Sequence, residues 1–267
     1  MKKFFLAVIA LLMTAGLSAQ FYIYLSDGNV LKADSISLVA PAEPVEPEYV
    51  QPIRVDDNSL ADWDNIPQDK IASATCPADA ALLGLKSVKV YADKYFIFIQ
   101  LEPDMEVVTD LEWVPLHVML NTDNSDLSGG YGDEFLDANT NILLEGGVFA
   151  DGEPLNYNPA VYKWWGEVGG DGWDWVDPSI EHTSDDCWGA LVCEGLLLGA
   201  SSQFVGGKIE IQLLREAIPA DWNEDEFGIG FDIQQSWVSV GVLPQNPFTE
   251  GDQWIGKAHK LQVKIDK

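Results

Sequence analysis

An all-β fold, a jelly-roll-like β-sandwich, is the fold class that the sequence predicts. The apolar residues fall in short runs separated by Gly, Pro and Asp, as expected of a chain built from many short strands. Two of these runs, 208–213 and 260–265, alternate apolar and polar residues, which is the pattern of a half-buried strand. No segment carries a sustained helical period, and only residues 213–217 indicate a turn of helix.

Residues 1–19 have the features of a secretory signal peptide. Lys2 and Lys3 precede a short apolar run, and the small residues around Ala19 mark the expected cleavage point. This run is too short to span a bilayer, and no later segment is long and apolar enough, so no membrane insertion is expected. The sequence therefore predicts a protein that is secreted, periplasmic or displayed at the cell surface.

Three further parts follow the signal peptide. Residues 20–39 read as a hairpin, because Asp27 and Gly28 between two apolar runs mark a reversal of the chain. Residues 40–52 are rich in Pro and Glu, which favours an extended linker. Residues 53–267 are numerous enough to form a single β-sandwich domain with one sizeable core.

The expected strands of this domain are short and closely spaced. They cover residues 87–92, 95–101, 114–120, 142–149, 160–165, 191–198, 208–214, 227–233 and 260–265. Residues 95–99 are apolar on both faces of the expected strand, which predicts a position in the centre of a sheet.

The charge of the chain excludes two classes of partner. Its formal net charge is −28 at pH 7, and removal of the signal peptide makes the mature chain still more negative. Such a surface repels phosphate groups and anionic lipid headgroups. We therefore expect no nucleic-acid binding and no attachment to an anionic membrane surface.

The three cysteines are an odd number for an exported chain. Cys187 and Cys193 are close enough in sequence to bridge a hairpin or a bulge, which leaves Cys76 as a free thiol. The alternative is that all three are buried thiols, which are common in proteins. Their spacing, without nearby histidines, argues against a zinc site.

An acidic, Gly-rich loop occupies residues 121–146 and contains no Lys or Arg. Calcium takes six to eight oxygen ligands from side chains of this kind, and glycines let the backbone curl around the ion. The spacing does not fit an EF-hand, and a solvated acidic loop is the alternative. The candidate calcium ligands are Asn121, Asp123, Asp126, Asp133, Asp137 and Glu145.

Half of the ten tryptophans fall in one segment, which interleaves them with Gly and carboxylates. Aromatic rings pack against the C–H faces of sugar rings, while acidic and amide groups bind the hydroxyls. The alternative is that these rings fill the core. The candidate carbohydrate-binding residues are Trp164, Trp165, Trp173, Trp175 and Trp188. His117 lies in an apolar strand, where a satisfied core or edge residue is the simplest interpretation.

Several motifs resemble those of the family 9 carbohydrate-binding modules and their DOMON-like relatives. In chain order they lie at residues 57–63, 88–96, 121–123, 129–131 and 141–146. The N-terminal hairpin segment also resembles a leader common in secreted Bacteroidetes proteins. The family resemblance covers about residues 54–266 and implies a β-sandwich with structural calcium near residues 121–145. It also implies a ligand held between tryptophans.

Three positions depart from the family pattern. Asn58 stands where the family has Gly, and Asn121 and Asn141 stand where it has Asp. Asparagine keeps a carbonyl oxygen and tolerates a left-handed backbone, so the turns are retained. The carboxylate charges that calcium would use at two of these positions are lost.

The sequence thus predicts an exported, non-catalytic protein that binds an oligosaccharide or polysaccharide, with calcium as a stabilising ion. A glycoside hydrolase that uses paired carboxylates is one alternative, since many of the 43 acidic residues could lie at a suitable separation. A structural or surface scaffold without a sugar site is another. No motif of a serine hydrolase, zinc protease or nucleotide-binding enzyme occurs in the sequence.

Overall fold

A computed structural model describes most of the chain in two units, Met1–Val50 and Gln51–Lys267. The described residues are 21–24, 30–33, 49–108, 112–131, 134–170, 175–176, 201–249 and 256–267. In the first unit, β1 (Phe21–Tyr24) and β2 (Val30–Ala33) pair antiparallel, which confirms the predicted hairpin. The predicted signal peptide, the linker up to residue 48 and the Cys187–Cys193 pair lie outside the described residues.

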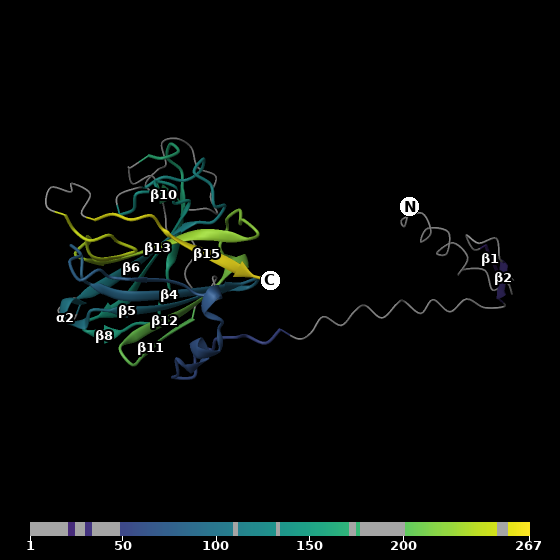
Figure 1. Ribbon diagram of the computed structural model, residues 1–267, viewed down its shortest axis with the longest axis horizontal. Coiled ribbons are helices and arrows are strands. Elements are labelled where there is room, and N and C mark those ends of the chain that lie inside the picture. Colours follow the sequence, from purple (N-terminus) through teal and green to yellow (C-terminus); the bar gives the residue numbers. More distant parts are fainter. Residues whose placement is uncertain are drawn as a thin grey trace. The chain divides into compact units, whose positions relative to one another are not determined.

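The second unit is nearly all β, which confirms the predicted fold class (Figure 1). Its strands belong to two sheets that enclose one core. Sheet 1 is formed by β3 (Ala72–Thr75), β4 (Leu85–Asp93), β5 (Phe96–Pro103), β11 (Ser201–Val205) and β12 (Lys208–Leu214). Sheet 2 is formed by β6 (Trp113–Asn121), β7 (Ile142–Ala150), β8 (Glu153–Pro154), β9 (Ala160–Trp164), β10 (Trp175–Val176), β13 (Glu226–Gln235) and β14 (Val238–Leu243).

The last strand, β15 (Leu261–Asp266), joins the two sheets. It pairs antiparallel with β13 of sheet 2 and parallel with β4 of sheet 1. A single mixed sheet therefore runs through both layers, in the order β10-β9-β7-β6-β13-β15-β4-β5-β12-β11.

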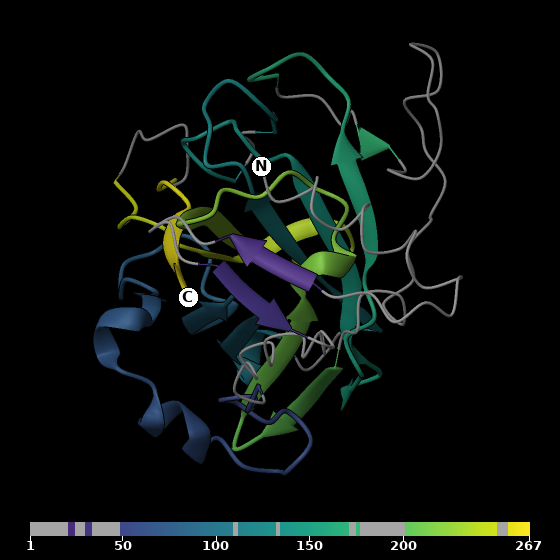
Figure 2. The ribbon, with the colours of Figure 1, turned by 90° about the vertical axis from the view of Figure 1, so that its right-hand side faces the viewer.

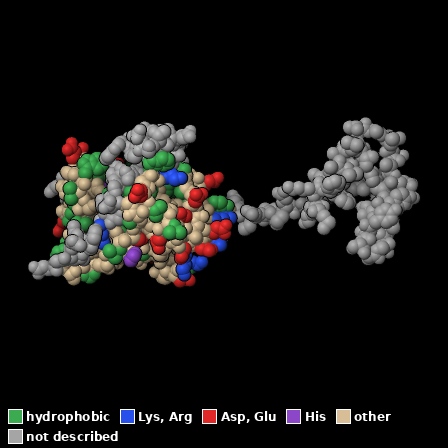
Figure 3. Space-filling model, turned by 90° about the horizontal axis from the view of Figure 1, so that it is seen from above, with side chains coloured by type: hydrophobic (Ala, Val, Ile, Leu, Met, Phe, Trp, Pro, Cys, Tyr) green, Lys and Arg blue, Asp and Glu red, His purple; other side chains and the backbone are tan. Residues whose placement is uncertain are grey.

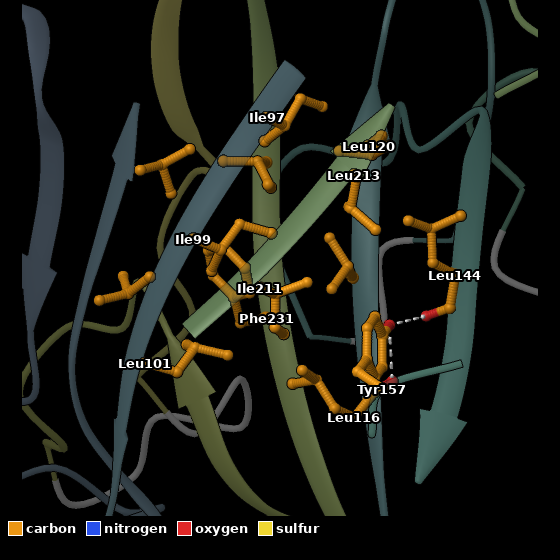
Figure 4. Close-up of a cluster of buried hydrophobic side chains, with 14 of the residues drawn as sticks. Ile97, Ile99, Leu101, Leu116, Leu120, Leu144, Tyr157, Ile211, Leu213 and Phe231 are labelled. Atoms are coloured by element: carbon orange, nitrogen blue, oxygen red, sulfur yellow. Dashed lines mark hydrogen bonds between the residues drawn. The ribbon is translucent and has the colours of Figure 1, made fainter. Parts of the chain in front are cut away.

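The core lies between the two sheets (Figure 4). Ile99 of β5 and Ile211 of β12 face Leu116 of β6 and Leu144 of β7, and all four are fully buried. Tyr157 enters the same core, with its hydroxyl 3.3 Å from the carbonyl oxygens of Leu116 and Leu144. Burial raises the pKa of this phenol well above its usual value. The buried hydroxyl is thus satisfied by the backbone of sheet 2.

Two short 3₁₀ turns, η1 (Ala61–Asn65) and η2 (Gln68–Lys70), precede β3 in the chain (blue in Figure 2). Trp63 of η1 is almost fully buried and belongs to a cluster with Phe98 on the outer face of sheet 1. Its indole nitrogen donates a 2.6 Å hydrogen bond to Glu210. Burial raises the pKa of the Glu210 carboxyl group. Trp63 therefore anchors the segment that leads into the sandwich.

The positions of the predicted strands agree closely with the structure, apart from 191–198, which lies outside the described residues. The predicted turn of helix corresponds to η4 (Arg215–Ala217). The sequence did not predict the helical turn α2 (Met105–Val108). It also does not predict β3, β8, β10 and β11, which have five residues or fewer, or β14, which follows a turn without Asn or Gly.

Candidate functional site

The candidate functional site lies on the outer face of sheet 2, which is directed away from the core. Because successive side chains of a strand point to opposite faces, the neighbours of the core leucines of β6 point outward. Asp232 of β13 pairs with His117 of β6, and His117 pairs with Glu145 of β7. We call Asp232, His117 and Glu145 the polar row. The strand register brings together three titratable side chains that are far apart in sequence.

His117 is fully buried between the two carboxylates. Its Nε2 atom lies 2.9 Å from Oε2 of Glu145, and its Nδ1 atom lies 3.7 Å from Oδ2 of Asp232. The Gln234 amide donates to Oδ2 of Asp232 at 2.5 Å and lies 3.3 Å from His117 Nδ1. These contacts fix the imidazole ring and, through it, the carboxylate of Glu145.

The two carboxylates of the polar row differ in their access to solvent. Asp232 is fully buried, and burial raises its pKa, against the opposing effect of His117. The Glu145 side chain keeps 14% of its surface exposed. Burial, with the charge of Glu145, raises the pKa of Tyr162 on the adjacent strand β9. Glu145 is therefore the member of the row that a ligand can reach.

An exposed pair of tryptophans flanks the polar row. The indole of Trp113 lies over Gly147, where an added Cβ would overlap its nitrogen. Gly147 follows Glu145 by two residues on the same face of β7, a distance of about 7 Å along the strand. Trp237 packs on Trp113 with ring centroids 5.6 Å apart and ring planes inclined by 57°. The exposed fractions of the two residues are 39% for Trp113 and 65% for Trp237.

Trp237 occupies a strained position at the tip of the β13–β14 hairpin. Ser236 and Trp237 form the two-residue turn, with φ angles of 49° and 66°. This left-handed conformation is normally filled by Asn and Gly, and a bulky residue there costs on the order of 1 kcal/mol. Such strain is characteristic of positions where the side chain has a functional role.

The opposite end of the same face is covered by the loop that follows β6. Phe135 of this loop lies over Gly230 of β13, and Tyr131 packs in the same cluster. Trp164 of β9 lies over Gly130 and closes the cluster from the side. The outer face thus has an apolar, covered end and a polar end bordered by exposed tryptophans.

We expect Gly230→Ala to lower the free energy of unfolding by about 1 to 3 kcal/mol, because the new Cβ would overlap the ring of Phe135. Urea denaturation measures this loss. The same change in a Phe135→Leu background should cost less, because the smaller side chain can move aside. Equal costs in both backgrounds would contradict the close packing of these two residues.

Of the predicted carbohydrate-binding tryptophans, only Trp164 and Trp165 have side chains that the structure describes. Trp164 is 7% exposed, and its nitrogen donates to the carbonyl oxygen of Glu167 at 3.1 Å, so it is a packing residue with no open ring face. Trp165 is 45% exposed. The backbone of Trp175 lies in β10 opposite Trp164. Trp173 and Trp188 lie outside the described residues.

The predicted calcium ligands that the structure describes lie in more than one part of the fold. Asn121 and Asp123 bind backbone or hydroxyl groups of their own loop. Glu145 belongs to the polar row, where its partner His117 is four residues from Asn121 along β6, or about 13 Å. Among the described residues, no three His, Cys, Asp or Glu side chains are grouped to hold a metal ion. Asp133 lies outside the described residues.

A lysine ammonium lies among the remaining predicted ligands. The buried Nζ atom of Lys260 donates to the backbone oxygen of Asp137 at 2.6 Å and to Oδ1 of Asn139 at 2.9 Å. It also lies 3.5 Å from Oδ2 of Asp137 and 5.3 Å from the centroid of the Phe135 ring. The Asn139 amide in turn donates to Asp126 at 2.8 Å. A positive charge from the chain itself therefore sits among these oxygens.

No pattern in the sequence marks Asp232, Trp113 or Trp237 as site residues. The interpretation of His117 as a satisfied core or edge residue agrees with its full burial, and its partners are two carboxylates. Only the pairing of strands places His117 between two carboxylates. The turn at Ser236 and Trp237 lacks the Asn or Gly that usually marks a hairpin. One signal was present in the sequence: a histidine in the apolar run 116–120 needs polar partners if it is buried.

Comparison of the chain with known protein families, with characterised proteins and with solved structures gave no match. In the part of the chain that the structure describes, no helix is long and apolar enough to cross a membrane.

Proposed function

We propose that this chain is an exported, non-catalytic glycan-binding protein that holds an oligosaccharide or polysaccharide on the outer face of sheet 2. The observation that carries the proposal is the exposed pair Trp113 and Trp237 beside the reachable carboxylate of Glu145. Indole rings offer flat apolar faces to sugar C–H groups, and a carboxylate accepts hydrogen bonds from hydroxyls. The motifs that resemble family 9 carbohydrate-binding modules support the same function.

The strain at Trp237 supports a ligand-binding role over a purely structural one. A scaffold would gain stability from Asn or Gly in this turn and would lose only the contact between two exposed rings. The two indole planes, inclined by 57°, can contact different units of a glycan or two sides of one unit.

Hydrolysis by the paired carboxylates of the polar row is disfavoured by what lies between them. Glycosidases place the scissile bond between two carboxyl groups that are roughly 5 to 10 Å apart. Here the imidazole of His117 fills the space between Glu145 and Asp232. Asp232 is also fully buried, so neither water nor a sugar can reach it from that side.

The test is titration calorimetry of the purified protein with glycans chosen from an array screen. Trp237→Asn and Trp113→Ala should each weaken binding about tenfold or more, the loss of a stacked aromatic anchor. Asn relieves the turn strain, so Trp237→Asn should at the same time leave the melting temperature unchanged or raise it. Loss of binding together with retained stability separates the ligand contact from the fold.

Trp165→Ala is the matched control, because Trp165 is similarly exposed but is not part of the pair. The affinity of this variant for the glycan should stay within about twofold of the wild-type affinity. If Trp165→Ala abolishes binding and the other two variants do not, the site lies in the segment that the sequence indicated. No heat with any glycan supports a scaffold, and release of reducing ends supports a hydrolase; either result overturns the proposal.

A further inference from the structure

Strands β6, β7, β8, β13 and β14 of sheet 2 come from parts of the sequence that have no Lys or Arg. No Lys or Arg occurs between Lys94 and Lys163, a stretch that supplies β6, β7 and β8. None occurs between Arg215 and Lys257, a stretch that supplies β13 and β14. On the face of the molecule seen in Figure 3, carboxylates are widely spread, and some Lys and Arg side chains lie among them. Apart from the imidazole of His117, which is buried between two carboxylates, these stretches therefore offer an anionic ligand no basic side chain.

The carboxylates and the aromatic rings at the polar end of this face favour a cation. Glu145 is a carboxylate whose side chain keeps 14% of its surface exposed, and its Oε2 atom lies 2.9 Å from His117. Asp232 adds a second acidic group behind the imidazole. The faces of Trp113 and Trp237 carry the negative side of the ring quadrupole, which attracts ammonium groups. Lys163 follows Tyr162 directly in β9 and so points to the opposite face of the strand.

We infer that the glycan bound here carries a free amine, as in a chain of N-unsubstituted hexosamine units, with the ammonium directed to Glu145. This inference rests on the proposed function, since it names the sugar class for the same site. Uronic acid and sulfated glycans are excluded by the same charges. The hydrogen bond from an ammonium to a carboxylate is stronger than that from a neutral hydroxyl, so the amine adds selectivity to ring stacking.

The experiment compares hexamers of glucosamine, N-acetylglucosamine, glucose and galacturonic acid by calorimetry at pH 5.5, where the amines are protonated. The glucosamine hexamer should bind about tenfold more tightly than the N-acetylated one, and its affinity should fall as salt rises. The galacturonic acid hexamer should give no heat. Hexalysine tests general attraction of a cation to an acidic protein, and it should bind much more weakly than the glucosamine hexamer.

Glu145→Gln is the decisive variant, because it removes the charge and keeps the shape of the side chain. It should reduce the preference for the free amine to within about twofold. Glu106→Gln, an exposed carboxylate of α2, is the control and should keep the full preference. Equal loss in both variants, or none in Glu145→Gln, overturns the inference.

Three further outcomes separate this inference from the proposed function. Equal binding of the glucose, N-acetylglucosamine and glucosamine hexamers, lost in Trp237→Asn, retains glycan binding and overturns the amine preference. Absence of binding to every hexamer overturns both. Tight binding of galacturonic acid overturns the inference alone.

Discussion

Lys260→Met should lower the free energy of unfolding by about 3 to 5 kcal/mol, the usual loss when one partner of a buried charged network is removed. The ammonium of Lys260 satisfies the backbone oxygen of Asp137 and the side chain of Asn139. Methionine fills a similar volume but donates no hydrogen bond, so these oxygens would stay buried and unpaired. Urea denaturation followed by tryptophan fluorescence measures the loss.

The pH dependence of this loss has a defined sign. Burial lowers the pKa of Lys260 from 10.5 to about 8. Between these values the unfolded chain binds more protons than the folded one, so the contribution of Lys260 to stability rises with pH from about 8 to about 10.5. The difference between wild type and Lys260→Met should therefore widen across this window, by on the order of 3 kcal/mol. Lys264→Met, at an exposed position of β15, is the control and should show neither effect.

Calcium gives a second test of the same feature. The sequence predicts that calcium raises the melting temperature, because clustered carboxylates need a cation. The ammonium of Lys260 already supplies positive charge to Asp137 and Asn139. We therefore expect calcium and EDTA to leave the melting temperature of the wild type unchanged. A clear rise with calcium would show that an ion binds elsewhere in the acidic loop.

Trp63→Ala should destabilise the protein by about 3 to 5 kcal/mol, as expected for a large buried aromatic residue. Trp63 is 2% exposed and fills the space over the outer face of sheet 1. Its removal also leaves the buried carboxylate of Glu210 without a donor that now lies at 2.6 Å. Trp63→Phe keeps much of the ring and loses only part of this energy, so the two variants divide packing from hydrogen bonding. Leu127→Ala, at a site that is 85% exposed, should stay within about 0.5 kcal/mol of wild type.

The all-β class and most strand positions could be predicted because they depend on local patterns. An alternating run such as 208–213 must form a half-buried strand whatever its neighbours are. The hairpin of β13 and β14 could not be predicted, since Ser236 and Trp237 carry no turn signal. The local pattern determines the strand, but the turn here is imposed by the rest of the fold.

The candidate site could be predicted only in part, because it depends on which strands are neighbours. The local sequence marks Glu145 only as one of several candidate calcium ligands, and it takes the register to place this residue beside His117. The alternation of residues 260–265 puts Lys260 on the solvent side, whereas the loop after β6 buries it. Contacts between residues more than a hundred positions apart leave no trace in the local sequence.

The position of β15 has a consequence for how the protein folds. Its partner in sheet 1, β4, lies about 170 residues earlier in the chain, where Ala92 pairs with Ile265. Contacts of such long sequence separation form slowly, because loop closure must precede any gain from pairing. Sheet 1 and sheet 2 can each begin to form from nearer segments, but they are joined only when β15 pairs with both β13 and β4. We expect the pairing of β15 with β4 to set the refolding rate. A substitution that weakens the pairing of Ile265 should therefore slow folding more than a substitution in the β4–β5 hairpin that costs the same free energy of unfolding.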